Sequence, residues 1–224
     1  MSVHRVVLFD LDGTISDSAP GIIRGIRHAL GVVGVHPPEG QDWSRYLGPP
    51  LRDMLVDFHG LTDDQVTVAV DAYLEYYNGG GMFENELYPG IPELIAELSR
   101  SGTSLAVATS KRAFMAQGIL DHFGLLEHFA VVEGAHPDGT GGRKHEVIAR
   151  VLDRLGTRDR DQGHGSGAVM IGDREHDIHG ASVLGLPTIG VSWGYAVDGE
   201  LEAAGADLIV DTVSELRAAL GLAR

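Results

Sequence analysis

Two aspartates one residue apart offer the first chemistry in this chain. Asp10 and Asp12 follow the apolar run 6–8, and Gly13 comes next. Residues two apart in a strand point to the same face, and glycine permits a sharp turn afterwards. The spacing therefore predicts two carboxylates on one face at the end of a buried strand, which suits a nucleophile beside a general acid and base. An ordinary turn after a strand has the same composition.

Three later segments bring further polar groups to the ends of apolar runs or to the start of a helical pattern. They contain Thr109 and Ser110 after the run 105–108, Lys144 at the start of a helical pattern, and Asp173 and Asp177 after the run 168–171. Ligands of open parallel sheets bind at the carboxyl ends of the strands. We therefore expect all of these groups near one edge of a sheet.

The elements that must position these residues alternate between strand and helix, which predicts an α/β fold with a parallel sheet covered by helices on both faces. Strands are predicted at 5–9, 104–109, 129–133, 168–172, 187–191 and 207–210, and helices at 91–101, 111–121, 144–156, 175–185 and 213–221.

Residues 16–88 break this alternation. No strand is predicted there, and apolar residues recur at helical spacing. Thr62 and Gln65 form a capping box at the start of one helix. Both ends of the region, 17–20 and 79–90, are rich in Gly, Pro and Ser, which suits hinges between two bodies. An ordinary flexible loop is the alternative for the triple glycine 79–81.

With its motifs in this order, the chain resembles the haloacid dehalogenase superfamily of phosphotransferases over nearly all of its 224 residues. The DxDGT motif matches 10–14, the Thr/Ser motif Thr109, the lysine motif Lys144 and the GDxxxD motif 172–177. Segments 17–20, 48–51, 172–174 and 190–195 are most similar to the phosphoglycolate phosphatase-like branch. The resemblance implies a Rossmann-like core, residues 1–15 and 89–224, and an all-helical cap, residues 16–88, that closes over the site.

The same resemblance implies a role for each motif residue. Asp10 would form an aspartyl-phosphate, while Asp12 would protonate the leaving group and then deprotonate water. Thr109 and the backbone N–H of Ser110, expected at the start of the next helix, would bind phosphate oxygens. Lys144 would bridge Asp10 and the phosphate.

A divalent metal ion is expected at the same site, and its hard oxygen ligands favour Mg²⁺. The family pattern assigns to it the Asp10 carboxylate, the Asp12 backbone carbonyl and Asp173, with Asp177 binding directly or through water. His176 and His179, which share one helix face, offer a competing metal site.

Composition limits the partners and the location. The net charge of −15 argues against binding to nucleic acid or to an anionic membrane. Positive charge must instead be concentrated locally, and Lys111 and Lys144, the only two lysines, both lie beside motif positions. There is no cysteine for a disulfide or thiolate site, no apolar stretch of membrane-spanning length and no signal-like start. We expect a cytoplasmic monomer or homodimer.

The expected function is a Mg²⁺-dependent phosphatase of small phosphorylated metabolites, similar to phosphoglycolate phosphatases. Asp12 argues against a dehalogenase, and the absence of lysine from 1–110 excludes a phosphonatase with a Schiff-base lysine in its cap. A nucleoside 5'-monophosphatase, a sugar-phosphate mutase and a noncatalytic phosphate-ester binding protein are the alternatives. Arg52, beside the segment 48–51, is the candidate for choosing the leaving group, with an ordinary surface arginine as the alternative.

Overall fold

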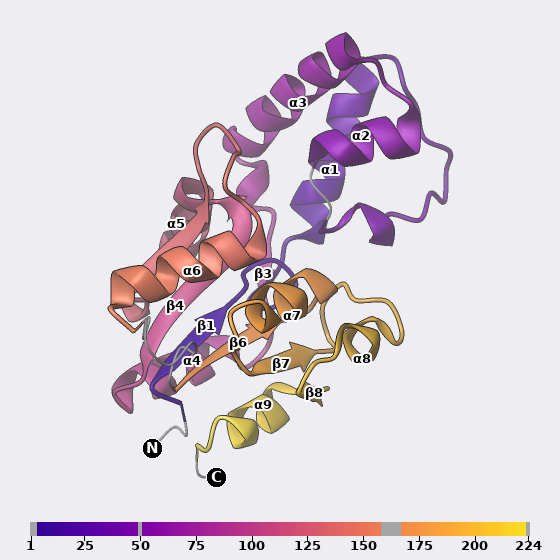
Figure 1. The fold of residues 1–224 in the computed structure, drawn as a ribbon. Coiled ribbons are helices and arrows are strands. Elements are labelled where there is room, and N and C mark those ends of the chain that lie inside the picture. Colours follow the sequence, from indigo (N-terminus) through magenta and orange to yellow (C-terminus); the bar gives the residue numbers. More distant parts are fainter. Residues whose placement is uncertain (1–3, 49–50, 158–166, 223–224) are drawn as a thin grey trace. The chain divides into compact units, whose positions relative to one another are not determined.

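The computed structural model describes residues 4–48, 51–157 and 167–222, and its chain forms two compact units (Figure 1). The first contains Met1–Asp17 and Leu87–Arg224, and the second contains Ser18–Glu86. Pro49 and Pro50 of the segment 48–51 lie outside the described residues. Within the described ranges, every helix is too short or too polar to span a membrane.

A six-stranded parallel sheet forms the centre of the first unit, in the order β5-β4-β1-β6-β7-β8 (Figure 1). Its strands are β1 (Val6–Phe9), β4 (Ser104–Arg112), β5 (Val131–Ala135), β6 (Ala168–Gly172), β7 (Thr188–Val191) and β8 (Leu208–Val210). Leu8 of β1 pairs with Ala106 of β4 on one side and with Met170 of β6 on the other. The predicted parallel α/β fold is confirmed. Because helices cover both faces, the central strand is apolar throughout.

Helices α6 (Lys144–Leu155) and α7 (Glu175–Ser182) pack on one face of this sheet. Their Val147, Val151 and Ala181 share a buried core with Leu8 and Met170. Helices α4 (Ile91–Arg100) and α9 (Val213–Ala219) pack on the other face, and α5 (Ala113–His122) lies against β4 and β5. A further helix, α8 (Glu200–Ala204), was not predicted, because its five residues are too few to show a periodic pattern.

The predicted boundary between β4 and α5 was wrong, and it bears on the site. The helix expected from residue 111 begins at Ala113, because β4 continues to Arg112 after a register shift in its pairing with β5. Ser110 therefore lies in a strand, and its N–H is not at a helix start.

The second unit is helical in its described residues, with α1 (Ala19–Val32), η1 (Ser44–Tyr46), α2 (Leu51–His59), α3 (Asp63–Asn78) and η2 (Gly81–Phe83). Its core includes Ile26, Leu30, Tyr46, Leu55 and Val66. The predicted capping box is confirmed, since the Gln65 N–H donates to Thr62 Oγ1 at 3.4 Å and the Thr62 N–H donates to Gln65 Oε1 at 3.1 Å.

Two short strands differ from the expectation that residues 16–88 contain helices alone. β2 (Ser16–Asp17) and β3 (Glu86–Leu87) form a separate two-stranded sheet at the two junctions between the units. Two residues per strand are too few to show the alternation by which a strand is predicted.

Candidate active site

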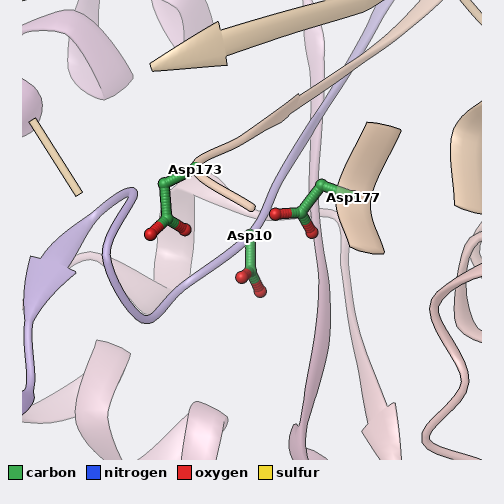
Figure 2. A group of neighbouring side chains, drawn as sticks. All are labelled: Asp10, Asp173 and Asp177. Carbon is green, nitrogen blue, oxygen red and sulfur yellow. The ribbon is translucent and has the colours of Figure 1, made fainter. Parts of the chain in front are cut away.

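Three buried aspartates meet at the carboxyl edge of the central sheet (Figure 2). Asp10 follows β1, Asp173 follows β6, and Asp177 lies in the first turn of α7. One carboxylate oxygen from each lies within 4.8 Å of the others. Figure 2 shows Asp10 between the other two. The parallel register of β1 and β6 brings Asp10 close to Asp173 and Asp177, which lie more than 160 positions after it in the chain.

The turn after β1 separates Asp10 from Asp12. The Asp10 N–H still donates to the Ile171 carbonyl at 2.9 Å, but the Leu11 carbonyl then accepts from the Ile15 N–H at 2.9 Å. Gly13 has a φ of +81°, and a Cβ there would overlap the Asp173 carboxylate, so this turn requires glycine. Because β1 ends at Phe9, the alternation that predicted a shared face does not extend to Asp12. Each aspartate instead pairs with a different lysine.

Lys144 begins α6 as predicted, and its buried ammonium makes three contacts. Nζ lies 2.9 Å from Asp10 Oδ1 and 2.7 Å from Asp177 Oδ1, and it donates to the Ala108 carbonyl at 3.0 Å. Burial by itself would lower the pKa of Lys144, but the two carboxylates outweigh it and hold the pKa above its ordinary value. Lys144 is thus a fixed cation beside Asp10. The predicted bridge consists of this contact and a second contact from Lys144 to a phosphate.

One ammonium does not balance three buried carboxylates. Burial raises the pKa of Asp10 to about 6, with Lys144 opposing the rise and Asp177 adding to it. Burial, followed by the charges of Asp177 and Asp10, raises the pKa of Asp173 well above its ordinary value. A divalent cation would relieve this repulsion, and carboxylate oxygens without nitrogen or sulfur suit Mg²⁺. The residues therefore fit the predicted metal.

Backbone and hydroxyl donors orient the acids of the cluster. Asp173 Oδ1 accepts from the Thr14 hydroxyl at 3.2 Å, and Oδ2 accepts from the Tyr195 N–H at 2.7 Å. Asp177 Oδ2 accepts from the Arg174 N–H at 3.1 Å. Sequence reasoning missed the contributions of Thr14 and Tyr195, although both belong to segments that carry the family resemblance. Contacts by backbone N–H leave no signal in residue types.

The end of β4 contributes the remaining predicted residues. Thr109 is buried, and its Oγ1 accepts from the Lys111 N–H at 3.2 Å, whereas Ser110 is exposed. Lys111 Nζ donates to Asp12 Oδ1 at 2.7 Å. The sequence had singled out Lys111 as one of two lysines beside a motif but had given it no role. Asp12 itself is not part of the three-aspartate cluster.

The histidine pair and Arg52 are the remaining candidates. His176 and His179 are exposed on α7, whereas Asp177 between them is buried. Over the described ranges, the only group of three or more His, Cys, Asp or Glu residues suited to a metal is the aspartate cluster. Arg52 is exposed near the start of α2 in the second unit.

Comparison with known proteins agrees with this geometry. The chain is 40% identical over 220 residues to Tyrosine-protein kinase PtkA of Mycobacterium tuberculosis, covering 97% of this chain and 73% of the relative. It is 38% identical to a 5'-nucleotidase of Pseudomonas aeruginosa (88% and 86% covered) and 30% identical to a phosphoglycolate phosphatase of Agrobacterium fabrum (96% and 91%).

Among solved structures, the chain superposes on a predicted phosphatase from Clostridium acetobutylicum with a TM-score of 0.88 and 37% identity, covering 97% and 98% of the two chains. Residues 7–191 match the family described as haloacid dehalogenase-like hydrolase. The predicted superfamily, its phosphoglycolate phosphatase-like branch and a phosphoric monoester hydrolase are confirmed. The chain belongs to the haloacid dehalogenase-like hydrolase family.

Proposed function

We propose that this chain is a Mg²⁺-dependent phosphatase of small phosphorylated metabolites that works through an aspartyl-phosphate on Asp10. The observation that carries the proposal is the buried cluster of Asp10, Asp173 and Asp177, in which the Lys144 ammonium contacts Asp10 and Asp177. It provides a fixed nucleophile and a set of oxygen ligands for a divalent cation at one place.

Two half-reactions follow from this arrangement. First, an Asp10 carboxylate oxygen attacks phosphorus, the bond from phosphorus to the leaving oxygen breaks, and Asp12 gives its proton to that oxygen. Then the Asp12 carboxylate takes a proton from water, the water oxygen attacks phosphorus, and the bond to Asp10 breaks to release inorganic phosphate. Thr109 and the Ser110 N–H would hold the nonbridging oxygens during both steps.

The metal would be held by the Asp10 and Asp173 carboxylates and the Asp12 backbone carbonyl. Asp177 Oδ1 lies 2.7 Å from the Lys144 ammonium, whose positive charge opposes a second cation at that oxygen, whereas the Asp173 oxygens accept from the neutral donors Thr14 and Tyr195. This favours a contact through water for Asp177. When bound, Mg²⁺ supplies positive charge that neutralises the phosphate oxygens.

The substrate is a small phosphate monoester, and two leaving groups have support from relatives. A phosphoglycolate phosphatase is 30% identical and a 5'-nucleotidase is 38% identical to this chain. Nucleoside 5'-monophosphates are therefore the second candidate beside phosphoglycolate-like metabolites. A sugar-phosphate mutase would use the same aspartates but would return the phosphoryl group to a sugar rather than to water.

The test is phosphate release from a panel of phosphoglycolate, nucleoside 5'-monophosphates, sugar phosphates and p-nitrophenyl phosphate, with and without Mg²⁺. The proposal expects Mg²⁺-dependent release by the wild-type chain and a hydroxylamine-sensitive phosphoenzyme that Asp10→Asn lacks. Absence of release from every ester with Mg²⁺ present would contradict it.

A second arm addresses the relative that is named a tyrosine-protein kinase. The chain is incubated with ATP and Mg²⁺, and phosphotyrosine and free phosphate are both measured. Transfer to tyrosine without hydrolysis of any monoester would replace the phosphatase proposal with a kinase that uses the same Asp10.

A further inference from the structure

The geometry points to Lys111 as a positioning residue for Asp12, and we infer that its ion pair aims the Asp12 carboxylate at the leaving-group oxygen. This inference rests on the proposed function, because it assigns Lys111 a part in the proton transfer of that reaction.

The ion pair is short and sheltered. Lys111 Nζ lies 2.7 Å from Asp12 Oδ1, and the two side chains are 8% and 20% exposed. Exposed pairs of this kind are screened by water and restrict their side chains little. A pair with a nearly buried lysine restricts the rotation of the carboxylate more strongly. Asp12 and Lys111 are 99 positions apart in the chain, so the tertiary fold brings them into contact.

The backbone of β4 directs Lys111 to this place. β4 and β5 pair at Ala108↔Glu133 and again at Arg112↔Ala135, so residues 109–111 lie opposite Gly134 alone. Such a bulge changes the direction of the side chains it contains. A Cβ on Gly134 would overlap the Lys111 carbonyl, so glycine at this position makes room for the bulge. The same bulge contains Thr109, the predicted phosphate ligand, which ties Lys111 to the reaction centre.

Each of the two lysines of the chain contacts a different one of the aspartates Asp10 and Asp12. Lys144 contacts Asp10 and Asp177, while Lys111 contacts Asp12. Loss of Lys111 should therefore leave the nucleophile in place and disturb proton transfer. If Lys111 bound the phosphate instead, its loss would lower kcat/KM equally for every phosphate ester.

Leaving-group dependence separates these roles. An alkoxide needs a proton when the phosphoenzyme forms, whereas p-nitrophenolate departs almost without one. The parameter kcat/KM reports on that first half-reaction. We expect Lys111→Met to lower kcat/KM for an alkyl phosphate by about 10-fold or more, below the ~10²- to 10⁴-fold of removing a general acid. For p-nitrophenyl phosphate the loss should stay within about 3-fold.

Arg112→Met is the matched control, because it removes the adjacent positive charge on β4, and it should affect both substrates alike and little. Lys111→Arg should recover part of the loss on the alkyl phosphate. In an Asp12→Asn background, Lys111→Met should cause no further selective loss, since the two residues act as one unit. Lys111→Gln, and the same cycle built with it, keep the test valid if thermal unfolding shows that Lys111→Met is unstable.

Equal losses on both substrates would overturn the inference and make Lys111 a phosphate ligand. Unchanged kinetics on both would overturn it as well. In either case the proposed phosphatase function would still hold, provided that the wild-type chain is active. A wild-type chain inactive on both esters with Mg²⁺ would instead contradict the proposed function, and this inference with it.

Discussion

Asp10 and Asp12 lie two positions apart, yet their carboxylates pair with different lysines and are assigned different work. Asp10→Asn should abolish both turnover and the phosphoenzyme, because the amide is not a nucleophile. Asp12→Asn keeps the nucleophile and removes the proton donor, so turnover of an alkyl phosphate should fall by ~10²- to 10⁴-fold. Steady-state rates and trapping of the phosphoenzyme measure both effects. Near-native turnover by Asp10→Asn would show that the nucleophile is misassigned.

Lys144 provides a second test at the level of single residues. Its side chain is 5% exposed and contacts two buried carboxylates. Lys144→Met leaves these carboxylates without their cation, which should cost ~3 to 5 kcal/mol of unfolding free energy without metal. Arg154→Met removes the exposed partner of Glu133 and should cost less than ~1 kcal/mol. Urea unfolding in the absence of divalent ions measures both, and similar small losses would argue against a charged cluster.

Among the elements, the sequence predicted those strands and helices whose residues show a local hydrophobic pattern. The apolar runs of β1, β4 and β6 and the helical start at Lys144 were all visible, and so was the order of the motifs. The continuation of β4 to Arg112 was not, because residues 109–112 are all polar and the bulge arises from pairing with β5. Lys111, which pairs with Asp12, lies in that bulge. Local patterns therefore indicated that Asp10, Lys144 and Asp173 meet at one sheet edge, but they gave no sign that Lys111 pairs with Asp12.

The packing of α2 against η1 in the second unit predicts a dependence on pH. His59 Nε2 lies 3.1 Å from the Tyr46 hydroxyl, and burial, followed by the charge of Arg45, lowers the pKa of His59 from 6.5. The unfolded chain then binds a proton more readily than the folded chain, so this contribution to stability is present above pH 6.5 and is lost as the pH falls from that value through the lower pKa of the folded chain.

Urea midpoints at about pH 7.5 and about pH 5 give the measurement. The wild-type chain should lose more stability on acidification than His59→Gln, whose side chain does not titrate. His36→Gln serves as the control, because His36 is exposed in the same unit. An equal or larger loss in His59→Gln would contradict the assignment.

The whole molecule carries a net charge of −15, and the proposed reaction nevertheless requires it to bind a phosphate dianion. The structure meets this requirement by placing both lysines at one sheet edge beside a cluster suited to a cation. A chelator should therefore stop activity and lower the melting temperature, because the acids repel one another without a metal, and Mg²⁺ should restore both. Activity that persists in chelator would contradict the metal proposal. Restoration by Zn²⁺ but not by Mg²⁺ would return attention to His176 and His179.

Division into two units predicts that substrate choice is separable from chemistry. The proposed core residues grip only the phosphoryl group, so the choice between glycolate and a nucleoside must come from other residues. Of the arginines in the helical unit, Arg24 pairs with Glu84, and Arg45 lies 4.3 Å from the centre of the Phe58 ring. Arg52 is exposed near the start of α2, and we propose that it selects an anionic leaving group.

Arg52→Ala should then lower kcat/KM for a substrate with an anionic leaving group. The loss should correspond to ~1.5 to 3 kcal/mol of transition-state stabilisation, the value of a charged hydrogen bond. Hydrolysis of p-nitrophenyl phosphate, whose leaving group offers no carboxylate or phosphate, should barely change. Arg27→Ala, at another exposed arginine of the same unit, is the control and should leave both substrates unaffected. Equal losses on both substrates would assign Arg52 to folding or to closure of the helical unit. No loss on either would make it an ordinary surface residue, and specificity would then be sought in the loop around Trp193 and Tyr195, whose backbone already contacts Asp173.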